Sequence, residues 1–293
     1  MTSALILAAG FGTRLRPLTL ELPKPVVPVG DRPLLAHVSA ACRRAGARQL
    51  VANVHHEHWK ISSIIDALAL NVDVVVEAQI RGTAGGVAGA RARLGSGAVL
   101  VWNGDILTDA PAQELLATAA EHDAMVLAVA PRAGGEGTVG LDDAGHVVRL
   151  RGQVFGREAR SADYMGVMAL GPSVVAGLPE QGCLFADYAL PHLAQSGRVL
   201  TVASLAPWSD LGDLPAYVAA NWAWLAARGA SSFVASGAEL APGVHVERSL
   251  IGAGAKVLGA GEVNGVIAWP GATLTAPLSR AVVLGSGLVV PWA

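Results

Sequence analysis

Short apolar runs alternate with helical patterns along the chain as far as about residue 228. Apolar runs of roughly four to eight residues bounded by turn residues are typical of buried strands. This alternation predicts an α/β fold, a Rossmann-like and mostly parallel sheet sandwiched by helices, in which ligands bind at the carboxyl ends of the strands. The predicted strands read ALILAAG, RQLVANV, VDVVVEA, AVLVWNGD, AMVLAVA and VLTVASL.

After the helical segment PAYVAANWAWLAARG the pattern changes to short repeats. The motif Gly-Ala-x-Leu/Val starts at Gly237 and recurs twice, each start 17 residues after the last. Such repeats predict a solenoid of short strands, and parallel β-helices built from hexapeptides have this texture. An irregular tail rich in glycine and alanine is the alternative. A second track of apolar residues follows at steps of 16: Leu250, Val266 and Val282.

The change of pattern predicts two domains, residues 1–229 with the α/β sheet and residues 230–293 with the repeats. Trp222 and Trp224 precede the change and lie two positions apart, so they cannot share one helical face. We therefore expect at least one of them to pack between the two regions.

Composition narrows the class of protein. With 293 residues and 52% hydrophobic content the chain can fill a sizeable core, and its net charge of −2 argues against a nucleic-acid or membrane-surface protein. The apolar N-terminal stretch is too short for a membrane helix. Cys42 and Cys183 have no metal-like or redox spacing, so both are interpreted as small apolar residues of a cytoplasmic protein.

The loop after the first strand, GFGTRLRPLTLELPKP, fits neither common phosphate-binding template. A Walker A loop is not present, and the third glycine of the dinucleotide fingerprint is replaced by Leu15. Gly10 and Gly12 still allow close backbone approach, and Arg14 and Lys24 supply positive charge. Because prolines flank Lys24, its backbone is restricted. The loop is therefore an anion site of another design, although an exposed lysine in a proline-rich turn is the simpler alternative.

Two aspartates end or follow apolar runs far apart in the chain. Asp105 lies in WNGD and Asp210 in WSDLGD, each close to a glycine. Two carboxylates that converge from distant strands can hold Mg²⁺, which prefers oxygen ligands and retains water and substrate phosphate oxygens. Each aspartate taken singly is more typical of a turn or a helix cap.

The segment EAQIRGTAGG combines Glu77 with small residues that leave room for a flat base or a ribose before a helix. An ionised carboxylate only accepts hydrogen bonds, so Glu77 matches the N1–H and N2–H donors of guanine better than uracil. A solvated glutamate at a strand end is the alternative. The histidines of NVHHEHWK lack the spacing of a metal site, and we interpret them as a solvated loop.

Five motifs together resemble the sugar-1-phosphate nucleotidylyltransferases: LAAGFGTRLRPLTLELPKPVVPVG, GTAGG, WNGD, FADYALPHL and WSDLGDLPAY. The first matches the pattern of this family almost letter for letter, and the repeats resemble the left-handed β-helix that many members carry. The resemblance implies that a sugar-1-phosphate oxygen attacks the α-phosphorus of a nucleoside triphosphate and that pyrophosphate leaves. The protein then supplies position and charge rather than covalent chemistry.

The resemblance also implies roles for particular residues. Arg14 would steady the leaving pyrophosphate and Lys24 would hold a phosphate, as the catalytic residues, while Asp105 and Asp210 would bind Mg²⁺. The implied sugar-binding residues are Asn103, Gly140 and Gly166. The implied nucleotide-binding residues are Leu7, Ala8, Ala9, Gly10, Gly12, Thr13, Arg14, Glu77, Gly82 and Thr83.

One departure from the family concerns the sugar. Where many members have Glu-Lys-Pro, with a lysine that contacts the sugar phosphate, this chain has Gly152 and Gln153. Arg151 could replace that cation, or the sugar could be bound as in N-acetylmuramate-1-phosphate uridylyltransferases, which the stretch DYMG also resembles. Base and sugar therefore stay open.

Several functions are consistent with these residues. The leading hypothesis is a guanylyltransferase acting on mannose-1-phosphate or a related sugar, because of GTAGG and Glu77. The alternatives are a uridylyltransferase for another sugar phosphate and a non-catalytic regulatory homologue that binds a nucleotide sugar. An acyltransferase built on the β-helix is disfavoured, since His245 has no supporting site. The oligomeric state stays open: a short solenoid with an open end often needs a partner, which would make a homo-oligomer, or a cap.

Overall fold

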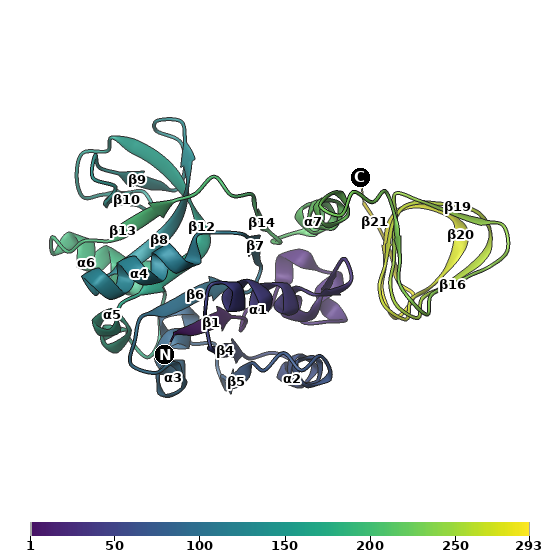
Figure 1. Cartoon of the computed structure of the whole chain (residues 1–293), viewed down its shortest axis with the longest axis horizontal. Helices are drawn as coiled ribbons and strands as arrows, with labels where there is room; N and C mark the ends of the chain where they lie inside the picture. The colour runs from purple at the N-terminus through teal and green to yellow at the C-terminus, as the bar shows by residue number, and fades with distance from the viewer. Residues whose placement is uncertain (1, 293) are drawn as a thin grey trace. The chain divides into compact units, whose positions relative to one another are not determined.

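The computed structural model describes residues 2–292, and these form two compact units (Figure 1). The first unit holds the chain up to Gly10 together with Leu35–Asp210. The second holds Phe11–Leu34 together with the chain from Leu211 onward. The predicted boundary near residue 229 falls between the last helix and the first strand of the repeats, and it stays a prediction.

A ten-stranded sheet forms the centre of the first unit. Its parallel strands are β1 (Ser3–Leu7), β4 (Gln49–Val54), β5 (Asp73–Val76) and β6 (Val99–Asn103). Next to β6 runs the antiparallel β12 (Arg160–Leu170). The sheet continues through β8 (Met125–Arg132), β9 (Val139–Leu141), β10 (Val147–Leu150), β11 (Gln153–Val154) and β13 (Leu200–Ala203). The predicted mostly parallel α/β sheet is thus confirmed.

Alternating side chains of the central strands bury both faces of this sheet. On one face Leu5 and Val101 join a core that includes Val87 of a covering helix, while Ile6 and Trp102 are buried on the other face. The helices are α1 (Leu34–Arg44), α2 (His58–Ala67), α3 (Gly82–Leu94), α4 (Ala112–His122), α5 (Pro172–Gly177) and α6 (Leu190–Ala194). Two further strands, β7 (Ile106–Thr108) and β14 (Trp208–Asp210), pair with each other.

The second unit combines the glycine-rich loop, one helix and the repeats. The loop forms short 3-10 turns at Thr13–Leu15, Leu18–Leu20 and Lys24–Val26, followed by the small hairpin of β2 (Pro28–Val29) and β3 (Arg32–Pro33). Helix α7 (Leu214–Ala226) begins at Asp213, whose carboxylate accepts a hydrogen bond from the Ala216 N–H at 3.0 Å. This bond satisfies one of the free N–H groups at the helix start.

The repeats coil into a parallel β-helix, drawn in yellow-green and yellow in Figure 1. Leu240 pairs with Val257 and Val257 with Leu274, so the predicted 17-residue repeat is the register of the coil. The strands are β15 (Phe233–Val234), β16 (Glu239–Leu240), β17 (Val244–Glu247), β18 (Leu250–Ile251), β19 (Lys256–Ala268), β20 (Thr273–Val283) and the antiparallel β21 (Val289–Pro291).

The predicted second track was wrong by one residue. Leu250 pairs with Ile267, and Ile267 with Val282, whereas Val266 points into the core of the coil. The register between β19 and β20 shifts between Gly259 and Val263, so the spacing is not a uniform 16.

Both tryptophans of α7 contact residues of the repeat region, as expected for at least one. The Trp224 ring packs edge-to-face on the Phe233 ring, with ring centroids 5.1 Å apart. The ring centroids of Trp222 and Trp292 lie 5.9 Å apart. No helix within residues 2–292 combines the length and the apolar character that crossing a bilayer requires.

Candidate functional site

The carboxyl ends of four parallel strands meet at one edge of the first unit. Leu7 of β1 is in register with Asn53 of β4 and with Asn103 of β6, and Val54 of β4 is in register with Val76. Residues that follow these positions therefore lie side by side, at the edge where open α/β sheets bind ligands. Of the predicted residues, the structure brings Ala8, Glu77 and Asn103 to this edge.

A buried asparagine that the sequence analysis did not single out joins these strand ends. The side-chain oxygen of Asn53, Oδ1, accepts a hydrogen bond from the Ala8 N–H at 3.1 Å. The side-chain nitrogen, Nδ2, donates to Glu77 Oε1 at 2.8 Å. Asn53 is 2% exposed, so both contacts form away from water, where such bonds fix geometry strongly. The available signal was a polar residue inside the buried strand QLVANV.

Glu77 is itself buried and hydrogen-bonded. Its second oxygen, Oε2, accepts from the Arg81 N–H at 3.0 Å, and its own backbone pairs with Val54. Only 3% of Glu77 is exposed. The alternative of a solvated strand-end glutamate was therefore wrong. The carboxylate joins three segments of the edge, while its contact with a base stays a prediction.

Of the two predicted metal ligands, Asp210 ends β14 and Asp105 lies in the turn between β6 and β7. Asp210 of β14 is in register with Ile106 of β7, and Ile106 directly follows Asp105. The turn before Asp105 is tight because the Gly104 N–H donates to the Leu7 carbonyl at 2.9 Å. A Cβ at Gly104 would lie 2.7 Å from that oxygen, so only glycine fits.

These two aspartates fit a divalent ion. Their oxygens are the hard donors that such ions prefer, and two protein carboxylates leave positions for water and phosphate. Among residues 2–292 no group of three or more histidine, cysteine, aspartate or glutamate side chains has metal-binding geometry. The pair thus suits a metal ion that takes its remaining ligands from water and substrate, rather than a closed protein site.

Tyr164, whose role no sequence motif indicated, lies near Asp105. Burial raises the pKa of its hydroxyl, and the negative charge of Asp105 adds to this effect. The ring packs edge-to-face on Phe185 with centroids 5.1 Å apart. Within the described part of the chain its buried hydroxyl has no hydrogen-bond partner. An unsatisfied buried hydroxyl beside the carboxylate is a candidate ligand contact.

The predicted sugar-binding residues lie in two different parts of the sheet, Gly166 near Asn103 and Gly140 away from both. Gly166 has φ +77°, and a Cβ there would meet Ile106 and lie 3.4 Å from the Asn103 amide nitrogen. Gly140 instead pairs with Ser161, which lies five residues before Gly166 on β12, or about 16 Å along an extended strand. A Cβ at Gly140 would clash with the Glu158 carboxylate.

Beside Gly140 lies an ion pair that the sequence did not indicate. Arg149 donates to both carboxylate oxygens of Glu158, at 2.7 Å and 3.0 Å, and the Ser161 hydroxyl donates to the same carboxylate. Hydrogen bonds from Arg149 and Ser161 lower the pKa of Glu158 to about 2. The carboxylate is therefore charged at any pH of physiological interest.

The family lysine is absent because the chain turns where it would lie. Leu150 pairs with Gln153, which leaves Arg151 and Gly152 as a two-residue turn with φ +50° and +79°. Positive φ at both positions is the geometry of a tight hairpin, and it explains the glycine. Arg151 is exposed, and its replacement of the missing cation stays a prediction.

The GTAGG motif is held by the stretch that precedes FADYALPHL. Leu184 N–H donates to the Thr83 hydroxyl at 2.8 Å, and Ala84 N–H donates to the Gly182 carbonyl at 2.9 Å. A Cβ at Gly82 would clash with that same carbonyl. Two motifs separated by a hundred residues thus form one surface at the start of α3.

Cys183 lies within this surface. Burial opposes ionisation of its thiol, but N–H groups of Phe185 and Ala186, the Thr83 side chain and the charge of Arg151 together lower its pKa. The interpretation of Cys183 as a small apolar residue stays a prediction. Cys42 is buried, and burial raises its pKa to about 12. Both cysteines are free thiols.

The predicted cations belong to the second unit. Gly12 has φ +63° and packs against the Lys24 stem, where a Cβ would lie 3.1 Å from the Lys24 Cβ. Its carbonyl accepts a hydrogen bond from the Thr19 hydroxyl at 2.8 Å. Arg14 lies against Gly212, where a Cβ would lie 2.9 Å from a guanidinium nitrogen. The glycines therefore position both cations, whose contacts with phosphates stay predictions.

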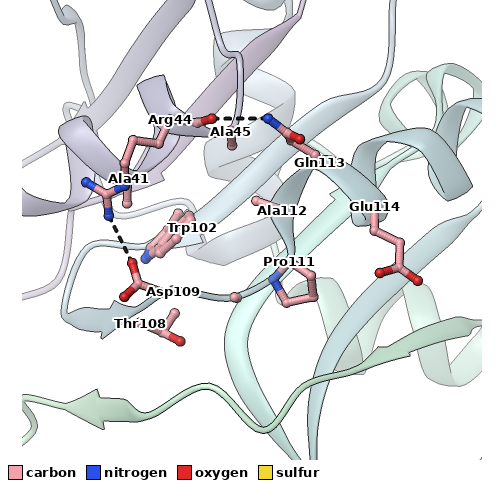
Figure 2. Close-up of a pocket in the computed structure, with 11 residues that line it drawn as sticks. Ala41, Arg44, Ala45, Trp102, Thr108, Asp109, Pro111, Ala112, Gln113 and Glu114 are labelled. Atoms are coloured by element: carbon pink, nitrogen blue, oxygen red, sulfur yellow. Dashed lines mark hydrogen bonds and ion pairs between the residues drawn. The ribbon is translucent and has the colours of Figure 1, made fainter.

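A cavity of about 410 Å³ in the first unit is not this site. Figure 2 shows it between α1 and the segment that leads into α4, with Trp102 on its wall and an Arg44–Asp109 ion pair of 3.0 Å. None of the residues predicted to bind substrate or metal lines it. The Trp102 ring N–H donates to the Ile106 carbonyl at 3.0 Å, and Thr108 of β7 also lines the cavity.

The fold and the strand-end residues define an α/β protein with a polar edge at the carboxyl ends of its parallel strands and an appended β-helix. Comparison with known families makes this specific: residues 3–226 match the nucleotidyl transferase model, and the chain belongs to this family. Members of the family generally use a divalent metal ion.

Individual relatives agree with the assignment. The chain is 30% identical to a probable mannose-1-phosphate guanylyltransferase 2 of Arabidopsis thaliana over 231 residues, 73% of this chain and 63% of that protein. It is 27% identical over 267 residues to a probable mannose-1-phosphate guanylyltransferase 1 of Oryza sativa subsp. japonica, 86% of this chain and 73% of that protein. The chain thus spans less than two thirds of the Arabidopsis relative.

A solved structure has the same fold. HddC from Yersinia pseudotuberculosis, crystallised with GMP-PN, superposes with a TM-score of 0.63 at 21% identity. The match covers 76% of this chain and all of that one.

Proposed function

We propose that the protein joins GTP and mannose-1-phosphate, or a closely related sugar 1-phosphate, to give a nucleotide sugar and pyrophosphate. The observation that carries the proposal is that Asp210 is in register with Ile106, the residue after Asp105, and that Asp105 follows the strand end Asn103 at the sheet edge that also carries Glu77. Family membership and relatives named as mannose-1-phosphate guanylyltransferases support it.

In the proposed reaction an oxygen of the sugar phosphate attacks the α-phosphorus, and the bond from that phosphorus to the β-phosphate oxygen breaks. Asp105 and Asp210 hold Mg²⁺, which would neutralise charge on the phosphate oxygens. Arg14 steadies the leaving pyrophosphate, and Lys24 holds the phosphate under attack. The proposal needs no covalent intermediate on the protein, so the rate depends on position and charge.

The base is proposed to be guanine because Glu77 keeps lone pairs beyond the two hydrogen bonds it accepts. Glu77→Gln is the informative variant, although it has a structural effect. A glutamine amide turns an N–H₂ group toward Asn53 or toward the Arg81 N–H, which places donor against donor and lowers stability. The ratio of kcat/KM for GTP to that for UTP isolates base recognition, because a general loss of stability lowers both.

The test is pyrophosphate release with four nucleoside triphosphates against a panel of common sugar 1-phosphates, with Mg²⁺ present. The expected result is turnover with GTP and mannose-1-phosphate above every other pair. Binding heat without product would favour a non-catalytic regulatory homologue. Preference for UTP with another sugar phosphate would favour the uridylyltransferase, for which the Arg151–Gly152 turn in place of the family lysine is the specific observation.

A further inference from the structure

The segment that carries the predicted cations is built into the unit that contains the β-helix. Residues Phe11–Leu34 group with the chain from Leu211 onward, although they directly follow the first strand of the α/β sheet. Lys24 lies near the middle of this segment. Contacts on either side of Lys24 therefore decide how firmly its ammonium group is aimed.

On the N-terminal side, Glu21 is held by the turn between β20 and β21. The Ser286 hydroxyl donates to Glu21 Oε2 at 2.6 Å, and the Ser286 N–H lies 3.2 Å and 3.3 Å from the two carboxylate oxygens. Gly285 leaves room for this carboxylate, since a Cβ there would lie 2.8 Å from Oε1. Charge-assisted bonds of this kind are short and directional.

On the C-terminal side, Pro28 is held through a buried chain of two hydrogen bonds. The Tyr217 hydroxyl donates to the Pro28 carbonyl at 2.8 Å and accepts from the Trp269 ring N–H at 3.0 Å. Tyr217 is fully buried and Trp269 is 2% exposed. Burial makes these bonds costly to break, because each would leave an unsatisfied polar group.

We infer that the β-helix positions Lys24, with Glu21, Ser286 and Trp269 as positioning residues that act through the backbone of the cation-bearing segment. The two contacts lie three residues before Lys24 and four residues after it, and both end on the coil. Small displacements of a catalytic group reduce turnover strongly, so a coil that contacts no substrate still affects the rate. This inference rests on the proposed function, since Lys24 has a catalytic role only there.

The test uses full-length variants Glu21→Ala and Gly285→Ala, with Glu239→Ala as the matched control. Gly285→Ala keeps both partners and only pushes the end of a flexible side chain aside, so it should leave the melting temperature unchanged. Glu239 is likewise an exposed carboxylate at the surface of the coil, and its carboxylate lies 3.7 Å from the Lys256 ammonium group.

Two measurements are made on each variant. We expect kcat for pyrophosphate release to fall about tenfold in Glu21→Ala and severalfold in Gly285→Ala, with KM for the triphosphate changed less. Hydrogen exchange by mass spectrometry should become faster in peptides covering residues 17–29, where the Val26 and Val27 N–H groups are bonded. Glu239→Ala should match the unmodified protein in both measurements.

The outcomes separate this inference from the proposed function. Unchanged exchange over residues 17–29 in both variants overturns the inference, and so does faster exchange with unchanged kcat. If the unmodified protein releases no pyrophosphate with any substrate pair, the proposed function fails, and hydrogen exchange still decides whether the coil holds the segment.

Discussion

The two units hold their predicted functional residues by different means. In the first unit, backbone hydrogen bonds place both aspartates: Asp210 lies in the ladder of β14 with β7, and Asp105 lies between that ladder and the Gly104–Leu7 hydrogen bond. In the second, Arg14 and Lys24 lie on a segment of 3-10 turns, and side chains from distant parts of the chain hold it. Backbone hydrogen bonds between strands fix the position of a residue through its near neighbours. Side-chain contacts from distant parts of the chain make that position depend on the whole unit.

This difference predicts which functional residues are affected by substitutions far from them in the structure. We expect an aspartate placed by the backbone to respond little to changes in the β-helix, and a cation held by long-range side-chain contacts to respond more. Four substitutions examine this contrast, from the largest expected effect to the smallest.

Asp105→Asn is expected to reduce turnover by a hundredfold to a thousandfold, the scale of losing a charge-stabilising group. The amide keeps the shape of the side chain but not its charge for the metal. Pyrophosphate release at saturating Mg²⁺ measures the effect. Asp109→Asn is the matched control, since Asp109 is exposed and pairs only at the surface with Arg44. Near-normal turnover of Asp105→Asn would contradict the metal-binding role.

Lys24→Ala is expected to reduce turnover about a hundredfold, because the phosphate under attack loses its positive partner. Lys256→Ala, a surface lysine of the coil, serves as the control and should retain full activity. Single-turnover kinetics with GTP and mannose-1-phosphate would report the effect on the chemical step. If Lys24→Ala were as active as Lys256→Ala, the second unit would hold no catalytic cation at that position.

Gly30→Ala is expected to destabilise the protein by about 3 kcal/mol through overpacking and backbone strain. Gly30 has φ +61°, and a Cβ there would clash with the ring of Trp224. Gly229→Ala is a close control, with φ +63° and no atom within 4 Å, and should cost about 1 kcal/mol. Urea denaturation compares the two, and equal losses would show that the Trp224 contact does not hold the segment.

Glu158→Gln should have the smallest effect, and it depends on pH. Because Arg149 and Ser161 lower the pKa of Glu158 to about 2, the charged form stabilises the fold above the ordinary value of 4.5. This stabilisation is lost as the pH falls through 2. The free energy of unfolding of the natural protein should therefore exceed that of the variant at pH 6, and the gap should narrow between pH 4.5 and pH 2. If the difference in free energy of unfolding stayed constant over this pH range, protonation of Glu158 would not be coupled to folding.

Much of the fold could be predicted because local patterns carry it. Apolar runs indicated the strands, and the recurrence of Gly-Ala-x-Leu/Val gave the register of the coil directly. The second track failed because a register shift between Gly259 and Val263 is set by how neighbouring coils stack, which spacing does not encode. Periodicity thus predicts elements better than their exact pairing.

The site was predictable only where a motif marked it. Asn53 could not be predicted because its hydrogen bonds join segments that follow two neighbouring strands. Tyr164 could not be predicted because its hydroxyl loses water and finds no hydrogen-bond partner only when the chain folds. The contacts of Glu21 and Pro28 join residues about 190 to 265 positions apart. Such contacts leave no trace in the local sequence, since either partner taken singly is an ordinary polar residue.

The antiparallel β21 has a consequence for how this coil could have grown. Solenoids lengthen by duplication of a repeat, which requires a free parallel edge at the last coil. Here Val282 pairs with Val290 of the reversing strand, so the edge of β20 is occupied where a new coil would add. A duplicated repeat after Leu284 would displace β21 and move Ser286 away from Glu21. The length of the coil is thus coupled to the segment that carries Lys24, and selection on catalysis would oppose its extension at this end.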